Sequence, residues 1–126
     1  MDLPKTTAGP GAGDLLSQME RDWDARAREA PEYYIATGQQ QWRPEQFFTS
    51  GQVNVDNEIR ADAHCIGRGK SLGRMRALEI GCGAGRMTRA MASPFAEVHA
   101  LDISAEMIAL ARRNLSDLKN AFFYKK

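Results

Sequence analysis

A glycine-rich turn between a short apolar run and a helical segment constrains the fold of this chain more than any other feature. Arg76–Ile80 (RALEI) predicts a short β-strand, and Gly81–Gly85 (GCGAG) follows it directly. Arg86–Ser93 then predicts a helix, which Pro94 ends. This order of strand, glycine turn and helix is typical of α/β folds that contain a parallel sheet.

The same alternation of strands and helices continues to the end of the sequence. Glu97–Leu101 predicts a second strand, and Asn120–Tyr124 begins a third. Between them, Ser104 is a suitable N-cap for a helix over Ala105–Leu118, whose apolar residues recur at helical spacing. We therefore expect an α/β fold with about three parallel strands.

The N-terminal half predicts helices and carries most of the aromatic residues. Asp14–Ala30 has an apolar stripe at helical spacing with Asp14 as its expected cap, and Asp56–Ile66 predicts a second helix. Six of the ten Phe, Trp and Tyr residues fall between positions 23 and 48. Such a segment is expected to pack against the rest, either as core and lid or as an aromatic wall over a ligand.

These patterns divide the chain into three parts. Residues 1–13 are rich in glycine and proline and predict a mobile tail. Residues 14–74 predict a helical, aromatic-rich lead-in or lid, and residues 75–126 an α/β half-domain that is truncated at its C-terminal side.

Charge and composition exclude several functional classes. Lys and Arg number 17 against 16 Asp and Glu, and this balance argues against binding to nucleic acid. Neither a membrane span nor a secretory signal is visible, so we expect a cytoplasmic protein without a membrane partner. Two cysteines and two histidines lack zinc-finger spacing. We therefore expect no metal site and interpret His64 and Cys65 as structural residues without partners.

The glycine turn and the next strand end together predict a nucleoside site. Glycine permits tight backbone turns and a close approach of a ligand, and the helix that follows offers free N–H groups to an anionic group. Asp102 stands at the tip of the second strand, where a carboxylate can accept hydrogen bonds from both ribose hydroxyls. We expect an adenosine-containing ligand across the carboxyl ends of these two strands.

The glycine spacing departs from the dinucleotide-binding pattern G-x-G-x-x-G/A. On either way of counting, Arg86 or Thr88 occupies the third position of that pattern. Glu79, two residues ahead of the first glycine, is also foreign to it. An NAD(P)-dependent oxidoreductase would share Asp102 and is therefore kept as an alternative.

Two motifs carry a resemblance to a known family. Residues 77–86 (ALEIGCGAGR) strongly resemble motif I of class I S-adenosylmethionine-dependent methyltransferases. Residues 98–107 (VHALDISAEM) resemble the family's second motif, which comprises the acidic strand end and the helix after it. The resemblance covers about residues 75–119. The lead-in is similar to the segment before the domain in bacterial small-molecule methyltransferases, through Trp23-Asp24 and Tyr33-Tyr34-Ile35.

The resemblance implies S-adenosylmethionine as the cofactor and assigns roles by position. The three glycines of the turn and Cys82 would wrap its methionine part, and Glu79 would favour its ammonium group. Asp102 would bind the ribose hydroxyls, Ile103 would pack on the adenine, and Met107 would line the same pocket. The implied cofactor-binding residues are Glu79, Gly81, Cys82, Gly83, Gly85, Asp102, Ile103 and Met107. No catalytic residue is assigned.

The implied reaction is methyl transfer to a small-molecule acceptor, in a Rossmann-like fold of seven strands. Because only about three strands are expected here, we interpret the chain as the N-terminal part of a methyltransferase or a truncated product. Alone it is expected to bind the cofactor weakly and to transfer no methyl group. A remnant without catalysis, which binds the cofactor or only a partner subunit through its open sheet edge, is the remaining alternative.

Overall fold

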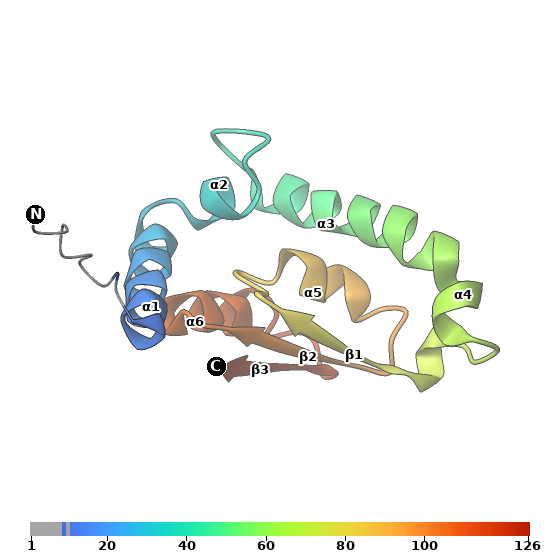
Figure 1. Cartoon of the computed structure of the whole chain (residues 1–126). Coiled ribbons are helices and arrows are strands. Elements are labelled where there is room, and N and C mark those ends of the chain that lie inside the picture. Colours follow the sequence, from blue (N-terminus) through green and yellow to red (C-terminus); the bar gives the residue numbers. More distant parts are fainter. Residues whose placement is uncertain (1–8, 10) are drawn as a thin grey trace, which may run out of the picture.

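Three parallel strands form the sheet that the sequence predicts (Figure 1). The computed structural model describes Gly9 and residues 11–126. The sheet order is β1-β2-β3, from β1 (Arg76–Ile80), β2 (Glu97–Asp102) and β3 (Ala121–Lys125). This arrangement confirms the α/β class and the expected number of strands.

Two helices connect these strands and cover one face of the sheet. They are α5 (Arg86–Met91), between β1 and β2, and α6 (Ala105–Asn114), between β2 and β3. Ser104 caps α6 as predicted, since its side-chain oxygen accepts a hydrogen bond from the backbone N–H of Met107 at 3.1 Å. The helix is shorter than the predicted 105–118.

The lead-in forms helices whose bounds differ from the sequence prediction. The elements are α1 (Ala12–Glu29), α2 (Pro31–Ile35), α3 (Pro44–Glu58), the 3₁₀ turn η1 (Arg60–Asp62), α4 (Ala63–Gly67) and the 3₁₀ turn η2 (Leu72–Arg74). The predicted helix over Asp56–Ile66 is wrong, because those residues are divided among the end of α3, η1 and α4. Most of the predicted tail, residues 1–8 and 10, lies outside the described residues.

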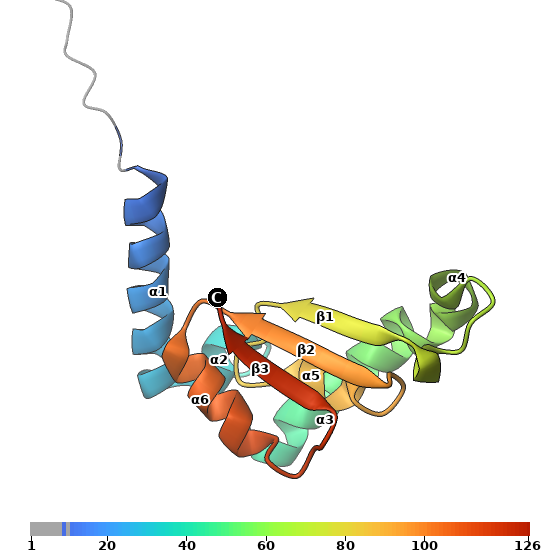
Figure 2. The same cartoon turned by 90° about the horizontal axis from the view of Figure 1, so that it is seen from below.

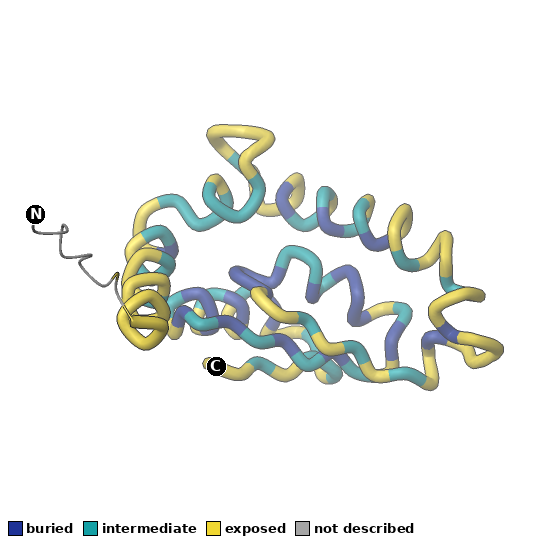
Figure 3. Tube along the Cα trace, in the orientation of Figure 1, coloured by how far each residue is buried: buried dark blue, intermediate teal, exposed yellow. Residues whose placement is uncertain are grey.

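Helix α1 packs mainly along its C-terminal half (Figures 2 and 3). Ala27 is buried and Trp23 half-buried, whereas Leu16 and Met19 of the same stripe are 56% and 48% exposed. The N-cap is Gly11, which makes no side-chain cap bond, so the prediction that Asp14 caps this helix is wrong. The N-terminal half of α1 projects beyond the sheet and therefore has little to pack against.

The larger core cluster lies between α3, α5 and the covered face of the sheet. Its buried members are Val55, Leu72, Ala90, Met91, Ala92, Phe95 and Val98. Helices α3 and α5 approach closely at Gly51, where an added Cβ would lie 2.2 Å from the carbonyl oxygen of Arg86. The Arg86 guanidinium also donates to Ser50 Oγ at 3.2 Å and to Asn54 Oδ1 at 2.8 Å. Packing and hydrogen bonds together fix α3 over the helix that follows the glycine turn.

The opposite face of the sheet is open in the described structure. Leu78 and Ile80 of β1 are 65% and 80% exposed, and Phe122 and Tyr124 of β3 are also exposed. In β2 the buried residues alternate, because successive side chains of a strand point to opposite faces. Among the described residues, no helix combines the length and the apolar character that crossing a membrane requires.

Candidate functional site

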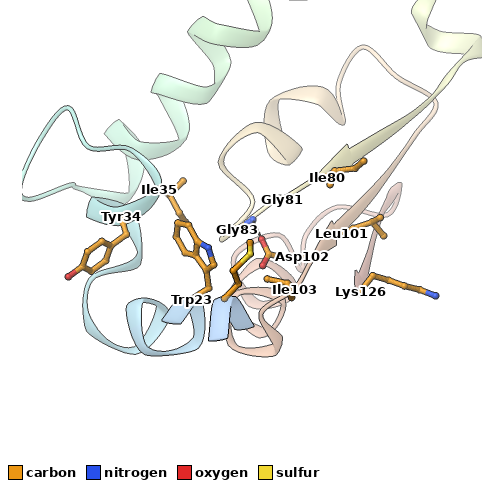
Figure 4. A pocket seen from close by; sticks show the side chains of 11 residues that line it. Trp23, Tyr34, Ile35, Ile80, Gly81, Gly83, Leu101, Asp102, Ile103 and Lys126 are labelled. Atoms are coloured by element: carbon orange, nitrogen blue, oxygen red, sulfur yellow. Dashed lines mark hydrogen bonds between the residues drawn. The ribbon is translucent and has the colours of Figure 1, made fainter. Parts of the chain in front are cut away.

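A cavity of about 390 Å³ lies at the carboxyl ends of β1 and β2, where the sequence predicts a ligand (Figure 4). One side is formed by α1 and α2 of the lead-in, and the other by the glycine turn and the strand ends. The lining residues are Met19, Trp23, Tyr34, Ile35, Ile80, Gly81, Gly83, Leu101, Asp102, Ile103 and Lys126. Four of the predicted site residues are therefore brought together here.

The glycines of the turn serve different purposes. Gly81, Gly83 and Gly85 all have positive φ, at 78°, 54° and 92°, a region that other residues rarely adopt. A Cβ at Gly81 would meet no described atom within 4 Å, so this position opens toward the cavity. A Cβ at Gly85 would lie 2.7 Å from Leu115 Cδ1, so this glycine packs against the core and lies outside the cavity lining.

Gly83 is the point at which the lead-in touches the turn. A Cβ at Gly83 would lie 2.8 Å from Ile35 Cδ1 of α2. The turn is also bonded to β2, because the N–H groups of Gly81 and Cys82 both donate to the carbonyl oxygen of Leu101, at 2.8 and 2.9 Å. The turn is therefore fixed by β2 on one side and covered by α2 on the other.

Asp102 is the buried carboxylate of the cavity. Its Oδ2 accepts from the N–H of Gly83 at 2.9 Å, and its Oδ1 accepts from the N–H of Ser104 at 2.9 Å. An ionised carboxylate offers about four acceptor positions, so these two bonds leave capacity for two further donors. The side chain is thus oriented by the backbone on both sides and can still accept from a ligand.

Glu79 lies beside the turn and outside the cavity lining. Its Oε2 accepts from the hydroxyl of Thr88 on α5 at 2.5 Å. Burial raises the pKa of the Glu79 carboxyl to about 7, against the opposing effects of the Thr88 hydrogen bond and the Arg86 charge. The charge of Glu79 therefore changes near neutral pH.

Cys82 and Met107 point into the protein and not into the cavity. Burial raises the pKa of the Cys82 thiol to about 12, so it is neutral, and only its backbone could serve a ligand. Met107 is 1% exposed and lies outside the lining, in contrast to the expected place in the pocket. Ile103 does line the cavity and is half-buried.

The lead-in contributes a wall that is partly aromatic. Trp23 and Tyr34 line the cavity, and the Arg26 guanidinium lies over both rings, 4.6 and 5.5 Å from their centroids. Three of the other aromatic residues stack edge-to-face on one another outside the lining, namely Trp42, Phe47 and Phe48. Two residues of the aromatic group therefore line the cavity, and whether they form a wall over a ligand stays a prediction.

Several lining residues were not singled out from the sequence. Met19 looks like an ordinary member of the α1 stripe, and Ile80 and Leu101 look like ordinary strand residues. Ile80 and Leu101 could have been found from their position, because both stand at strand ends that flank the turn.

A second group of polar side chains lies away from the cavity, around η1 and α4. Cys65 Sγ lies 3.2 Å from His64 Nε2, and one ligand atom each of these residues and Asp62 fall within 4.8 Å of one another. The expectation that His64 and Cys65 have no partners is therefore wrong. All three residues are exposed, and α4 lies at the far end of the sheet from α1 (Figure 1).

Comparison with known proteins assigns the α/β part. Residues 77–125 match a family described as a methyltransferase domain. An uncharacterized protein, syc1184_c from Synechococcus sp. (strain ATCC 27144 / PCC 6301 / SAUG 1402/1), is 48% identical over 54 residues, which cover 41% of this chain and 13% of that protein.

Solved structures show the class I methyltransferase fold. Phosphoethanolamine N-methyltransferase 1 from Haemonchus contortus, in complex with phosphoethanolamine and S-adenosylhomocysteine, has a TM-score of 0.70 at 14% identity over 93% of this chain and 22% of its own. Magnesium protoporphyrin IX methyltransferase (ChlM) from Synechocystis PCC 6803, with bound SAM, has a TM-score of 0.60 at 19% identity. The match covers 96% of this chain and 57% of that protein's chain. DhpI, in complex with SAH, has a TM-score of 0.54 at 28% identity, and the match covers 92% of this chain and 47% of the DhpI chain.

These matches confirm the Rossmann-like fold expected for a methyltransferase domain. The chain spans 13% of the curated relative and between 22% and 57% of the three structures. The β1, glycine turn and β2 segment that contains Asp102 lies within the matched residues 77–125, whereas α1 and α2 lie outside them.

Proposed function

We propose that this chain binds S-adenosylmethionine in the cavity and provides the cofactor-binding part of a methyltransferase for a small-molecule acceptor. The observation that carries the proposal is the buried Asp102 carboxylate, which faces the cavity beside the positive-φ glycine turn. The family of residues 77–125 and the ligands named for DhpI and ChlM agree with this cofactor.

The proposal gives each wall of the cavity a part of the cofactor. Asp102 would accept hydrogen bonds from the ribose hydroxyls with its two remaining acceptor positions. Ile103 would pack on the adenine, and the backbone at Gly81 and Gly83 would follow the methionine part. Glu79 would act on the ammonium group through the turn. The cofactor, when bound, supplies a methyl group on an activated sulfonium, so the protein mainly has to orient it.

A small acceptor is proposed because of the character of the wall opposite the strand ends. Trp23, Tyr34 and Ile35 present apolar and aromatic surface to the cavity, as is common for small-molecule sites. The net charge of +1 offers little attraction for a polyanionic acceptor. Both cysteines are free, which agrees with the proposed location in the reducing cytoplasm.

The proposal is tested by titrating the 126-residue chain with S-adenosylhomocysteine and, separately, with NAD⁺. We expect the first ligand alone to shift the amide NMR signals of Gly81–Gly85 and Asp102. Shifts with NAD⁺ instead would favour the oxidoreductase alternative. If neither ligand shifts these signals, the cofactor proposal is wrong.

A substitution of Asp102, compared with a control substitution elsewhere, tests the role of the cavity carboxylate. Asp102→Asn removes the charge that ribose hydroxyls would bind, and we expect S-adenosylhomocysteine affinity to fall by about 10- to 100-fold. Asp56→Asn is the control, because Asp56 is exposed and pairs with Arg60 outside the cavity. Calorimetric titration gives both affinities, and equal affinities for the two variants would contradict the role of Asp102.

A further inference from the structure

We infer that Asp24 of α1 is a positioning residue for the cavity carboxylate, so that docking of α1 and binding of the ribose reinforce each other. This inference rests on the proposed function. Sequence reasoning gave Asp24 no role in the site, and it lies outside the cavity lining. Its neighbour Trp23 faces the cavity (Figure 4). Asp24 itself bonds to Ser104 and Glu106 at the N-terminus of α6.

Asp24 completes the N-terminal cap of α6 from a distant part of the chain. The fully buried hydroxyl of Ser104 donates a hydrogen bond to Asp24 Oδ1. The same hydroxyl accepts from the N–H of Met107 at 3.1 Å, and the N–H of Glu106 points at Asp24 Oδ1 at 3.3 Å. Asp24 thus places a carboxylate where free N–H groups and the helix dipole favour one.

Ser104, the N-cap residue of α6, is also one of the two residues whose backbone N–H groups bond to the Asp102 carboxylate. The backbone N–H of Ser104 donates to Asp102 Oδ1, opposite the bond from Gly83 to Oδ2. With Asp24 in place, the Ser104 hydroxyl has both its donor and its acceptor satisfied, which fixes this residue. Without Asp24 the buried hydroxyl loses its acceptor, and such a group rearranges to find another. The N–H that orients Asp102 would then move with it.

Other contacts of α1 do not share this connection. Arg28 pairs with Glu106 at 3.0 Å, and Glu20 pairs with Lys125 at 2.9 Å. Both pairs are substantially exposed, and such pairs contribute little to stability. Neither pair includes a side-chain bond to Ser104 or to the Asp102 carboxylate, although Lys125 lies opposite Asp102 in the sheet and the Glu106 backbone donates to Asp24. Loss of Arg28 therefore separates general loosening of α1 from the specific effect of Asp24.

Because the proposed effect is on ribose recognition, its test compares adenosine with 2′,3′-dideoxyadenosine, which lacks the hydroxyls. NMR titration measures the affinities of both nucleosides and of S-adenosylhomocysteine. For Asp24→Ala we expect about 5- to 20-fold weaker binding of adenosine and S-adenosylhomocysteine, and a change within about twofold for dideoxyadenosine. Asp24→Asn keeps an oxygen acceptor and should restore most of the affinity. Arg28→Ala should leave all three affinities within about twofold.

A second variant covers the case in which Asp24→Ala fails to fold. Ser104→Ala should by itself reproduce the selective loss. If Asp24→Ala does fold, its combination with Ser104→Ala should cause no further loss, since both substitutions break the same connection. Equal losses for adenosine and dideoxyadenosine, or no loss, would overturn the inference while the proposed function stands. Failure of the unsubstituted chain to bind S-adenosylhomocysteine would overturn both.

Discussion

Glu79 shows how one half-buried residue can make the surroundings of the glycine turn sensitive to pH. It is held between the glycine turn and α5, where its carboxyl accepts from Thr88. Burial is the largest cause of the raised pKa of about 7, and the nearby Asp102 charge acts in the same direction. Near neutral pH the folded protein therefore contains a mixture of the neutral and ionised forms of this side chain.

The raised pKa has a defined consequence for stability. Between the ordinary pKa of 4.5 and about 7 the folded chain binds more protons at Glu79 than the unfolded chain does, so this residue makes stability fall as pH rises through that range. The cost above pH 7 is about 3 kcal/mol at the most. Glu79→Gln, which can still bond to Thr88, should remove this part of the slope and raise Tm at pH 8. Thermal unfolding from pH 4 to 8 measures it, and identical slopes for both proteins would contradict the assignment.

At the scale of elements, the site depends on a helix that does not line it. Helix α3 packs on α5, which begins where the glycine turn ends, and the contact is closest at Gly51. The Arg86 side chain adds hydrogen bonds to Ser50 and Asn54 across the same contact. The position of α3 therefore helps to fix the start of α5 and the end of the turn.

Gly51→Ala tests this contact. The added Cβ would meet backbone, which cannot move aside as a flexible side chain can, so α3 and α5 must separate. We expect the free energy of unfolding to fall by about 1–3 kcal/mol. Gly13→Ala in α1 is the matched control, because its Cβ would meet no described atom within 4 Å. That variant should gain up to about 1 kcal/mol from helix propensity. Equal effects of the two substitutions in urea unfolding would show that α3 and α5 do not meet as described.

At the scale of the whole molecule, the sheet has one covered and one open face. Val98 and Ala100 of β2 are buried under α5 and α6, whereas Leu78 and Ile80 of β1 are exposed on the other side. Among the described residues, the core therefore lies on one side of the sheet only. The contribution of an apolar residue should then depend on the face that it occupies.

Two leucine substitutions measure this asymmetry. Leu115 is 2% exposed beside Gly85, and Leu115→Ala should lower the free energy of unfolding by about 2–5 kcal/mol through lost burial and a cavity. Leu78→Ala, at 65% exposure, should change it by less than about 1 kcal/mol. Chemical denaturation of both variants compares the values. A cost at Leu78 as large as that at Leu115 would mean that the open face is covered in solution.

Much of the α/β part could be predicted because its signals are local. The three strands, the turn and the Ser104 cap each depend on residue types within a few positions of one another, and each lies where predicted. Asp102 could be placed because parallel strands bring their carboxyl ends to one edge. By contrast, α3 was missed since Gly51 interrupts its apolar pattern, and the reason for that glycine lies in another helix.

What the sequence determined by itself is therefore the order of strands and helices, the glycine turn and the carboxylate at the end of β2. The tertiary structure alone decided that Trp23 and Tyr34 complete the cavity, that Met107 turns into the core and that Asp24 reaches Ser104. The reason is separation along the chain. Local patterns set backbone conformation within a few residues, whereas these contacts join segments that only the packing of α1 and α2 against the sheet brings together.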